Sequence, residues 1–371
     1  MRSFVYSQKK HLILTGDRGS GKSTLLRELL PLLSDVPIPG LLTYAEPRCA
    51  VWLEETATGE RAQIGLYDEA LPGIENKMRP CTEGFAALGV PALCRLALGG
   101  SEWVMVDEIG YLESECADYC EAIRVLMVQK RVIAVVRKQK LDFLEELRNR
   151  DDVYLIDLDE PFGTLGCVIM ASGEGRRFGS NKLLADFAGE PMICRALAAT
   201  EGIFAERVVV TRHREVEALC RARGVRVVFH DLPYRSDTVR LGVEAMREEV
   251  SGCMFCPADQ PLLRRETVQA MAMAACRDDR MILRLSDGDC DGAPVVFPRR
   301  YFTELANLPQ GKGGGAVMKR YPDLIGRFRA DTWELEDIDT EEDLARLLAA
   351  NHLENRYWSG KISCVNPKDV V

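Results

Sequence analysis

Several features that would place a chain in a membrane or outside a cell are missing from this sequence. No run of about 18 apolar residues occurs, so no membrane span is expected. Residues 1–10 lack the apolar core of a secretory signal. The thirteen cysteines are odd in number and scattered, which excludes a dense disulfide framework and is typical of a reducing compartment. We therefore expect a cytoplasmic protein.

The sequence has no excess of basic residues either. Lys and Arg together number 48 against 57 Asp and Glu, which gives a formal net charge of -9. An acidic chain is poorly suited to non-specific binding of nucleic acid or of an anionic membrane, so neither is expected as a partner. A small anionic molecule can still be held by a local group of backbone amides and a few cationic side chains.

Common hydrolase and metal-site patterns are also absent. The chain has neither G-x-S-x-G nor H-E-x-x-H, and its four histidines show no triad or ligand spacing. Cys253 and Cys256 form a C-x-x-C pair, but no second pair follows at a spacing useful for zinc. We interpret these two cysteines as buried thiols in a strand.

The length of 371 residues and the hydrophobic content of 47% predict two globular domains. An apolar strand, a glycine-rich turn and a helix pattern follow one another at residues 11–30 and again at 166–200, which favours two α/β domains in series. We place the boundary near Pro161, where chain breakers follow an acidic stretch. The predicted division is 1–161, 162–352 and a tail over 353–371.

Apolar runs predict strands and helical periodicity predicts helices within these domains. Strands are predicted at 12–15, 104–106, 131–136, 167–171, 207–211, 225–229 and 253–256. Helices are predicted at 23–33 and 117–128. Thr340 and Asp343 form a capping-box pattern before leucines at helical spacing, which predicts another helix there.

The first glycine-rich turn fits the phosphate-binding pattern G-x-x-x-x-G-K-[ST]. Its glycines let backbone amides face phosphate oxygens, and the helix that follows adds its positive end. The lysine is expected to reach the β- and γ-phosphates, and the serine hydroxyl to bind Mg²⁺. The predicted nucleotide-binding residues of this turn are Gly16, Gly19, Gly21, Lys22, Ser23 and Thr24.

A short apolar strand over residues 103–106 ends in two acids that complete this first site. Asp107 is expected to hold, through water, the Mg²⁺ that Ser23 binds. Glu108 is predicted to be catalytic, because a carboxylate there can orient or deprotonate the attacking water. Arg137, after a later strand, could contact phosphate, although a lone basic residue there is more often surface charge.

Residues 10–160 resemble the THEP1-type P-loop nucleoside triphosphatases. The resemblance is carried by the turn at 16–24, by Gly40-Leu41-Leu42-Thr43, and by Asp107-Glu108-Ile109-Gly110 with Glu113. It implies NTP hydrolysis and does not identify a biological substrate.

The second glycine-rich turn has a different character. Gly173, Gly175 and Gly179 are spaced G-x-G-x-x-x-G, and two arginines lie in the turn, as a triphosphate requires and a neutral dinucleotide turn does not. Arg177 and Lys182 are predicted to flank the α- and β-phosphates as catalytic and nucleotide-binding residues. The glycines allow close backbone approach. The predicted binding residues are Ala171, Ser172, Gly173, Gly175, Arg177 and Lys182.

Nucleotidyl transfer also explains the acids in this half of the chain. In-line attack on the α-phosphorus joins two anions and releases pyrophosphate, so divalent metal and fixed cations matter more than a covalent nucleophile. Asp259 follows the apolar strand at 253–256 and is our first candidate ligand for Mg²⁺.

Residues 165–350 resemble the MobA-like nucleotidyltransferases, and most closely the MocA-type molybdenum cofactor cytidylyltransferases. The matching segments are 168–182, Gly189-Glu190-Pro191, the run Pro257-Ala258-Asp259-Gln260-Pro261, and residues 337–344. The resemblance implies that Asp339 is the second metal ligand beside Asp259. With Ala171 and Gln260 it implies CTP rather than GTP, and Ser236 as a contact to base or ribose. The implied acceptor is a molybdopterin-type cofactor.

Together these resemblances imply the fold class. We expect two Rossmann-like three-layer αβα domains, an N-terminal P-loop NTPase and a C-terminal domain like the nucleotide-diphospho-sugar transferases. The predicted activity is transfer of CMP from CTP to the cofactor, with Mg²⁺ and with an NTP-hydrolysing domain on the same chain.

Three departures from the family pattern follow the glycine-rich turn. Arg235 stands where glycine is usual, Ala293 where histidine is usual, and Lys312 where an acid is usual. The last two are on the acceptor side, which leaves two alternatives open. One is a chaperone that uses NTP hydrolysis to hand the cofactor to a molybdenum hydroxylase. The other is a sugar- or alditol-phosphate nucleotidyltransferase.

Overall fold

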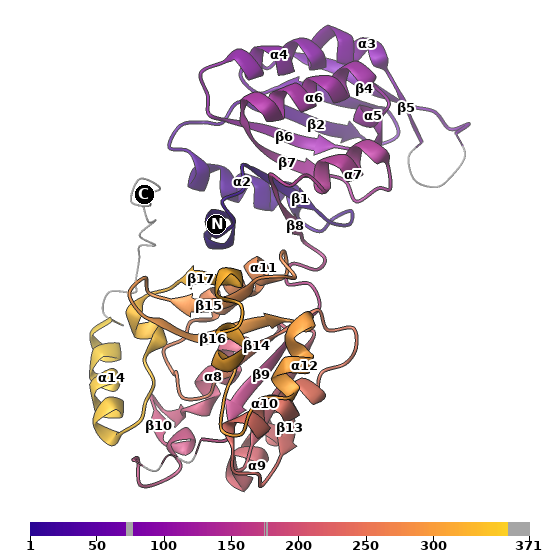
Figure 1. The fold of residues 1–371 in the computed structure, drawn as a ribbon. Coiled ribbons are helices and arrows are strands. Elements are labelled where there is room, and N and C mark those ends of the chain that lie inside the picture. The colour runs from indigo at the N-terminus through magenta and orange to yellow at the C-terminus, as the bar shows by residue number, and fades with distance from the viewer. Residues whose placement is uncertain (72–76, 174, 176, 355–371) are drawn as a thin grey trace. The chain divides into compact units, whose positions relative to one another are not determined.

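The structure is a computed structural model that describes residues 1–71, 77–173, 175 and 177–354. The chain divides into two compact units, Met1–Pro161 and Phe162–Val371, and each carries one large sheet with helices (Figure 1). The part of the predicted tail from residue 355 onward lies outside the described residues. None of the helices described is long and apolar enough to cross a membrane.

The first unit has an eight-stranded sheet in the order β5-β4-β3-β2-β6-β7-β1-β8. Its strands are β1 (His11–Thr15), β2 (Gly40–Glu46), β3 (Ala50–Glu55), β4 (Arg61–Tyr67), β5 (Met78–Pro80), β6 (Trp103–Ile109), β7 (Arg131–Val136) and β8 (Val153–Asp157). Strands β2, β6, β7, β1 and β8 are parallel, and β3 to β5 extend the sheet in antiparallel fashion. The carboxyl ends of β1 and β6 therefore meet at one edge.

Helices cover both faces of this sheet. They are α1 (Arg2–Ser7), α2 (Lys22–Leu33), α3 (Thr82–Gly84), a π-helical turn η1 (Phe85–Gly89), α4 (Val90–Leu98), α5 (Tyr111–Ser114), α6 (Ala117–Gln129) and α7 (Asp142–Arg148). Residues of α4, α6 and α7 share one apolar core with Ile13, Val106 and Ala134. Because side chains alternate along a strand, Leu12 and Leu14 face the other side, where α2 lies against β1 and β7.

The second unit has a seven-stranded sheet in the order β13-β12-β9-β14-β16-β15-β17. The strands are β9 (Leu165–Ala171), β12 (Glu206–Thr211), β13 (Arg226–Phe229), β14 (Gly252–Pro257), β15 (Ile282–Ser286), β16 (Asp291–Pro298) and β17 (Ile325–Arg329), with a separate pair β10 (Asp186–Phe187) and β11 (Glu190–Pro191). Strands β13, β12, β9 and β14 are parallel, and β16 is antiparallel to both β14 and β15.

The helices of this unit again lie on both faces (Figure 1). They are η2 (Lys182–Leu184), α8 (Ile193–Thr200), α9 (Arg214–Ala222), α10 (Arg235–Glu244), α11 (Arg265–Ala275), η3 (Arg299–Tyr301), α12 (Phe302–Ala306), α13 (Gly315–Met318), η4 (Pro322–Leu324), η5 (Thr332–Leu335) and α14 (Glu341–Glu354). Residues of α10 and α12 share a core with Val168, Val210 and Phe297. Both units are α/β domains of the expected class.

A smaller apolar cluster ties the second glycine-rich turn to the end of the domain. Phe178 and Phe187 pack with Ile338 and with Leu347 of α14. The Thr340 hydroxyl and the Asp343 carboxylate cap α14 reciprocally, so the predicted capping box is present. These contacts bring residues 337–340 beside the turn that carries Lys182.

Candidate functional sites

The first glycine-rich turn connects β1 to α2 and has the backbone that only glycine adopts easily. Gly16, Gly19 and Gly21 have φ values of +145°, +83° and +88°. A Cβ on Gly16 would lie 2.7 Å from the Ser20 Oγ. The Lys22 Nζ donates to the carbonyl oxygens of Gly16 at 3.0 Å and Asp17 at 2.6 Å. The lysine is therefore folded over its own loop, where a polyanion would compete for it.

The hydroxyl and the carboxylate predicted to hold a metal in this unit are in contact. The Ser23 Oγ, on the first turn of α2, donates to the Asp107 Oδ1, on β6, at 2.9 Å. Asp107 is buried, and burial raises its pKa, while the bond from Ser23 opposes that rise and the neighbouring Glu108 adds to it. Thr24 follows on the first turn of α2 with its side chain exposed.

Glu108 lies one residue beyond Asp107 and is held by a cation that follows the neighbouring strand β7. The Arg137 guanidinium pairs with the Glu108 carboxylate. Burial lowers the pKa of Arg137, but the charge of Glu108, its hydrogen bond and the charge of Glu113 together outweigh burial, so the net direction is upward. Arg137 therefore stays charged and sits beside the candidate catalytic carboxylate.

Glu113 is the most completely buried acid near this edge. The Gly110 N–H donates to its Oε2 at 2.8 Å, so the carboxylate caps the start of α5. Burial raises the pKa of Glu113 to about 7. Glu113 therefore stabilises the turn after β6. Its charge also raises the pKa of the nearby Arg137.

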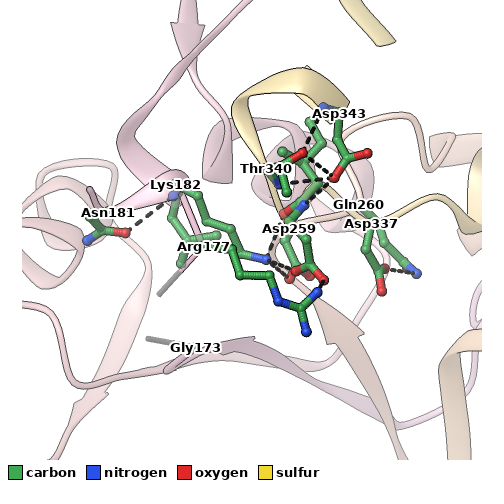
Figure 2. Close-up of polar contacts among 12 residues, drawn as sticks. Gly173, Arg177, Asn181, Lys182, Asp259, Gln260, Asp337, Thr340 and Asp343 are labelled. Carbon is green, nitrogen blue, oxygen red and sulfur yellow. Dashed lines mark hydrogen bonds and ion pairs between the residues drawn. The ribbon is translucent and has the colours of Figure 1, made fainter. Parts of the chain in front are cut away.

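The second site centres on Lys182, which is almost wholly buried although it is charged. Its Nζ lies 2.7 Å from the Asp259 Oδ2 and 2.9 Å from the Asp339 Oδ1, and it donates to the Ile338 carbonyl at 2.7 Å (Figure 2). Burial lowers the pKa of Lys182, and the two carboxylates raise it above its usual value. The structure thus brings together three residues that the sequence predicted separately.

Arg177 completes the same cluster from the solvent side. Its guanidinium lies 3.2 Å from the Asp339 Oδ2, and its side chain is 76% exposed. In Figure 2 Arg177 and Lys182 both extend from the glycine-rich turn toward the aspartates. A buried cation and an exposed cation therefore meet two carboxylates at the carboxyl edge of β9 and β14.

Asp337 lies close to this cluster but has a different partner. The Gln260 Nε2 donates to the Asp337 Oδ1 at 2.8 Å and to the Leu335 carbonyl at 3.2 Å. Burial raises the pKa of Asp337, and the charge of Asp259 adds to that effect. The Gln260 amide therefore anchors residues 335–337, and any influence it has on a nucleotide base would be indirect.

The rest of the predicted loop follows β9. The Thr211 hydroxyl donates to the carbonyl of Ala171, whose side chain is buried. The His213 ring contacts the Gly173 carbonyl at 2.8 Å. Gly175 has a φ of +58°, and a Cβ there would lie 3.1 Å from the Ser180 carbonyl oxygen.

Residues that sequence reasoning missed support the two loops from other strands. The Ser172 Oγ lies 2.9 Å from the His230 Nε2, and burial lowers the pKa of His230. The Asp17 N–H donates to the Asp159 Oδ2 at 2.8 Å. His230 and Asp159 each follow the carboxyl end of a strand, and this position was the only feature of the sequence that could have predicted their roles. Ser236, which was predicted, lies at the start of α10 and accepts a bond from the Gly311 N–H at 3.2 Å.

Both sites offer donors that fit Mg²⁺. This ion prefers oxygen ligands and is commonly held by one or two carboxylates together with substrate phosphates. The Ser23 and Asp107 pair and the Asp259 and Asp339 pair are of this kind. Within the described ranges no group of three or more His, Cys, Asp or Glu could hold a metal ion. Substrate phosphates and water would therefore supply the remaining ligands.

These two arrangements define a P-loop nucleotide-binding unit and a nucleotidyltransferase-like unit. Residues 11–161 match the NTPase family, and residues 167–324 match the MobA-like NTP transferase domain. The chain thus combines a THEP1-like NTPase domain with a MobA-like NTP transferase domain, as the sequence predicted.

The three relatives that follow each match one unit of the chain. Nucleoside-triphosphatase THEP1 of Thermotoga maritima is 29% identical over 154 residues, which is 40% of this chain and 86% of that protein. A probable molybdenum cofactor guanylyltransferase of Bacillus licheniformis is 29% identical over 193 residues, 48% of this chain and 94% of that protein. The structure of a Methanothermobacter nucleotidyl transferase aligns with a TM-score of 0.45 at 24% identity, over 52% of this chain and 99% of that one.

Proposed function

We propose that the second unit transfers a nucleotidyl group, CMP from CTP, to a molybdopterin-type cofactor and releases pyrophosphate. The observation that carries this proposal is the position of Lys182 between Asp259 and Asp339 beside a glycine-rich turn. The name of the Bacillus relative supports a molybdenum cofactor as acceptor. That name specifies guanylyl transfer, whereas Ala171 and Gln260 favour the cytidylyl family. The choice of CTP as the donor therefore rests on these two residues.

The cluster has the charge distribution that nucleotidyl transfer needs. A phosphate oxygen of the acceptor attacks the α-phosphorus, the bond to the β-phosphate oxygen breaks, and pyrophosphate departs with the negative charge. Lys182 keeps its proton and holds Asp259 and Asp339 together in spite of their mutual repulsion. Arg177 is exposed and would exchange its Asp339 partner for a phosphate oxygen. Mg²⁺ held by the two aspartates would neutralise charge on the reacting phosphates.

We propose that the first unit hydrolyses NTP. Lys22 would exchange the carbonyls of its own loop for β- and γ-phosphate oxygens. Ser23 and Asp107 would hold Mg²⁺, which neutralises phosphate charge. Glu108 would orient the attacking water, and Arg137 would hold the Glu108 carboxylate in place.

One experiment separates this proposal from its rivals. The purified chain is given each of the four NTPs with Mg²⁺, with and without molybdopterin-type cofactor, and pyrophosphate and orthophosphate release are measured separately. We expect cofactor-dependent pyrophosphate release, greatest with CTP and abolished by Lys182→Ala. Lys22→Ala is the matched control and should reduce only orthophosphate release.

The other outcomes each select a different function. Cofactor binding without pyrophosphate release would favour the NTP-driven chaperone that hands the cofactor to a hydroxylase. Pyrophosphate release that depends instead on a sugar or alditol phosphate would select that class of acceptor. Pyrophosphate release that persists in Lys182→Ala would contradict the site assignment.

A further inference from the structure

The ammonium group of Lys182 already uses its full set of donors. An ammonium carries three N–H groups. Three oxygens accept from this one, namely the Asp259 Oδ2 at 2.7 Å, the Asp339 Oδ1 at 2.9 Å and the Ile338 carbonyl at 2.7 Å. The side chain is only 7% exposed, so little water reaches these bonds. Lys182 can therefore bind a phosphate oxygen only by giving up at least one of its three partners.

The carboxylates that Lys182 contacts are the two that we expect to hold Mg²⁺. The ammonium lies against one oxygen of Asp259 and one oxygen of Asp339. The Arg177 guanidinium lies 3.2 Å from the second oxygen of Asp339. Three of the four carboxylate oxygens thus already face a cationic nitrogen. Because like charges at short range repel strongly, a divalent cation and the ammonium would compete for these two carboxylates.

The backbone that carries the two aspartates is tied down, whereas the lysine side chain is long. The Ile338 N–H donates to the Asp259 carbonyl at 3.0 Å, which joins the two segments. The Asp339 N–H donates to the Asp343 Oδ2 at 3.2 Å, in the cap of α14. Lys182 reaches both aspartates from η2 through a flexible four-carbon stem (Figure 2). The lysine is therefore the member of the cluster that can move away while the aspartates stay.

The predicted metal ligands of the first site have a different partner. The Ser23 Oγ donates to the Asp107 Oδ1 at 2.9 Å, and the Lys22 ammonium contacts carbonyl oxygens of its own loop. A neutral hydroxyl is itself a ligand for Mg²⁺ in such a loop, so it can stay when the ion arrives. In the second site, by contrast, a positive charge has to leave the carboxylates first.

We propose that the Lys182 ammonium occupies the place of the metal between Asp259 and Asp339 and leaves it only for a nucleotide phosphate, so that the second site binds Mg²⁺ together with NTP and not before it. The phosphates supply the acceptors that Lys182 loses, and their negative charge offsets the second cation. The inference rests on the proposed nucleotidyl transfer and adds the order in which metal and nucleotide bind. Removing the charge of Lys182 should therefore make the metal bind more tightly.

The test measures Mn²⁺ binding to the full-length chain by equilibrium dialysis without nucleotide. Mn²⁺ takes the same kinds of oxygen ligand as Mg²⁺. The reference protein carries Lys22→Ala and Asp107→Asn, which remove the lysine and a metal ligand of the first site. On this background, Lys182→Met removes the charge and Lys182→Arg keeps it. Lys319→Met is the matched control, because it removes one exposed lysine of the same unit and changes the net charge equally.

We expect Lys182→Met to bind one Mn²⁺ about tenfold more tightly than the reference protein, since the competing charge is gone. Lys182→Arg and Lys319→Met should bind it no more tightly than the reference, and adding Asp259→Asn to Lys182→Met should abolish the gain. A non-hydrolysable CTP analogue should tighten Mn²⁺ binding in the reference protein. If Lys182→Met is only marginally folded, the rise of its Tm with Mn²⁺ reports the same affinity, because an ion that binds the folded state stabilises it.

The order of binding and nucleotidyl transfer can fail separately, because Mn²⁺ binding is measured without turnover. Equal Mn²⁺ affinity in Lys182→Met and the reference protein, or an equal gain in Lys319→Met, would overturn the inference. So would a gain that persists with Asp259→Asn, or a reference protein that binds Mn²⁺ equally tightly with and without the analogue. A gain that requires Asp259, in a chain whose wild type releases no pyrophosphate, would support the role of Lys182 and refute nucleotidyl transfer.

Discussion

The two lysine-bearing loops of this chain hold their lysines in different ways. Lys22 contacts carbonyl oxygens of its own loop, no more than six residues away along the chain. Lys182 contacts carboxylates from two other segments, one of them 157 residues away. The partners of the first lysine are thus local, although Asp107 and Asp159 contact the same loop from other segments. The second depends on the fold of the whole domain to supply its counter-charges.

The largest effect that this comparison predicts is at the acids of the second loop. Asp259→Asn should reduce pyrophosphate release on the order of 10²- to 10³-fold, because it removes a metal ligand and a partner of Lys182. Orthophosphate release by the first unit should not change. Steady-state rates across a Mg²⁺ titration check this.

Asp337→Asn is the matched control for that substitution. Asp337 neighbours Asp259 in space but bonds to Gln260, so its amide variant should retain most of the activity and the same Mg²⁺ requirement. If the two variants were equally impaired, the distinction between the metal-binding aspartates and Asp337 would be wrong.

A somewhat smaller effect is predicted at the first loop. Glu108→Gln should lower orthophosphate release about a hundredfold, since the carboxylate that orients water is lost, while nucleotide affinity stays unchanged. Nucleotide binding and single-turnover hydrolysis measured on the same sample separate these two quantities. Glu115→Gln, at an exposed acid nearby, is the control, and an unaltered hydrolysis rate in Glu108→Gln would remove Glu108 from the mechanism.

The last prediction concerns how the free energy of unfolding depends on pH through Glu113, which lies near the first loop. The pKa of Glu113 is raised to about 7, so the folded state binds a proton that the unfolded state has already lost. The free energy of unfolding should therefore fall as pH rises from the ordinary glutamate pKa toward 7, by at most about 1.4 kcal/mol per pH unit.

Glu113→Gln keeps an oxygen that can accept from the Gly110 N–H and removes the titration. We expect its unfolding free energy to change less over this pH range than that of the wild type. Hydrogen exchange of β6 and α6 amides reports the change locally. A pH dependence that is identical in the two proteins would exclude Glu113 as its source.

The parts of the fold that the sequence predicted are those with strong local signals. Strands β1, β7, β9, β12 and β14 are buried apolar runs in the parallel parts of the two mixed sheets, and their positions were predicted to within about two residues. The antiparallel strands β3 and β4 were not predicted. Charged and polar residues interrupt β4 (Arg61–Tyr67), which lies next to the edge strand β5 and is partly exposed, whereas β3 (Ala50–Glu55) is mostly buried and has only a short apolar run before its two glutamates.

The same distinction applies to the sites. The turn before α2 and the Ser23 and Asp107 pair follow from motifs whose geometry is fixed by a strand, a turn and a helix. The contact of Lys182 with Asp339 depends on the packing of Phe178 against Ile338 and Leu347, which no spacing in the sequence specifies. The His230 contact with Ser172 is likewise a product of strand order.

The central claim is that the chain has two independent sites for a polyanionic nucleotide. The most direct test is the stoichiometry of binding of a non-hydrolysable NTP analogue with Mg²⁺, measured by equilibrium dialysis. Two equivalents per chain are predicted, with Lys22→Ala and Lys182→Ala each losing one and the double variant losing both. A single equivalent in the wild type, or the loss of both in either single variant, would contradict the account.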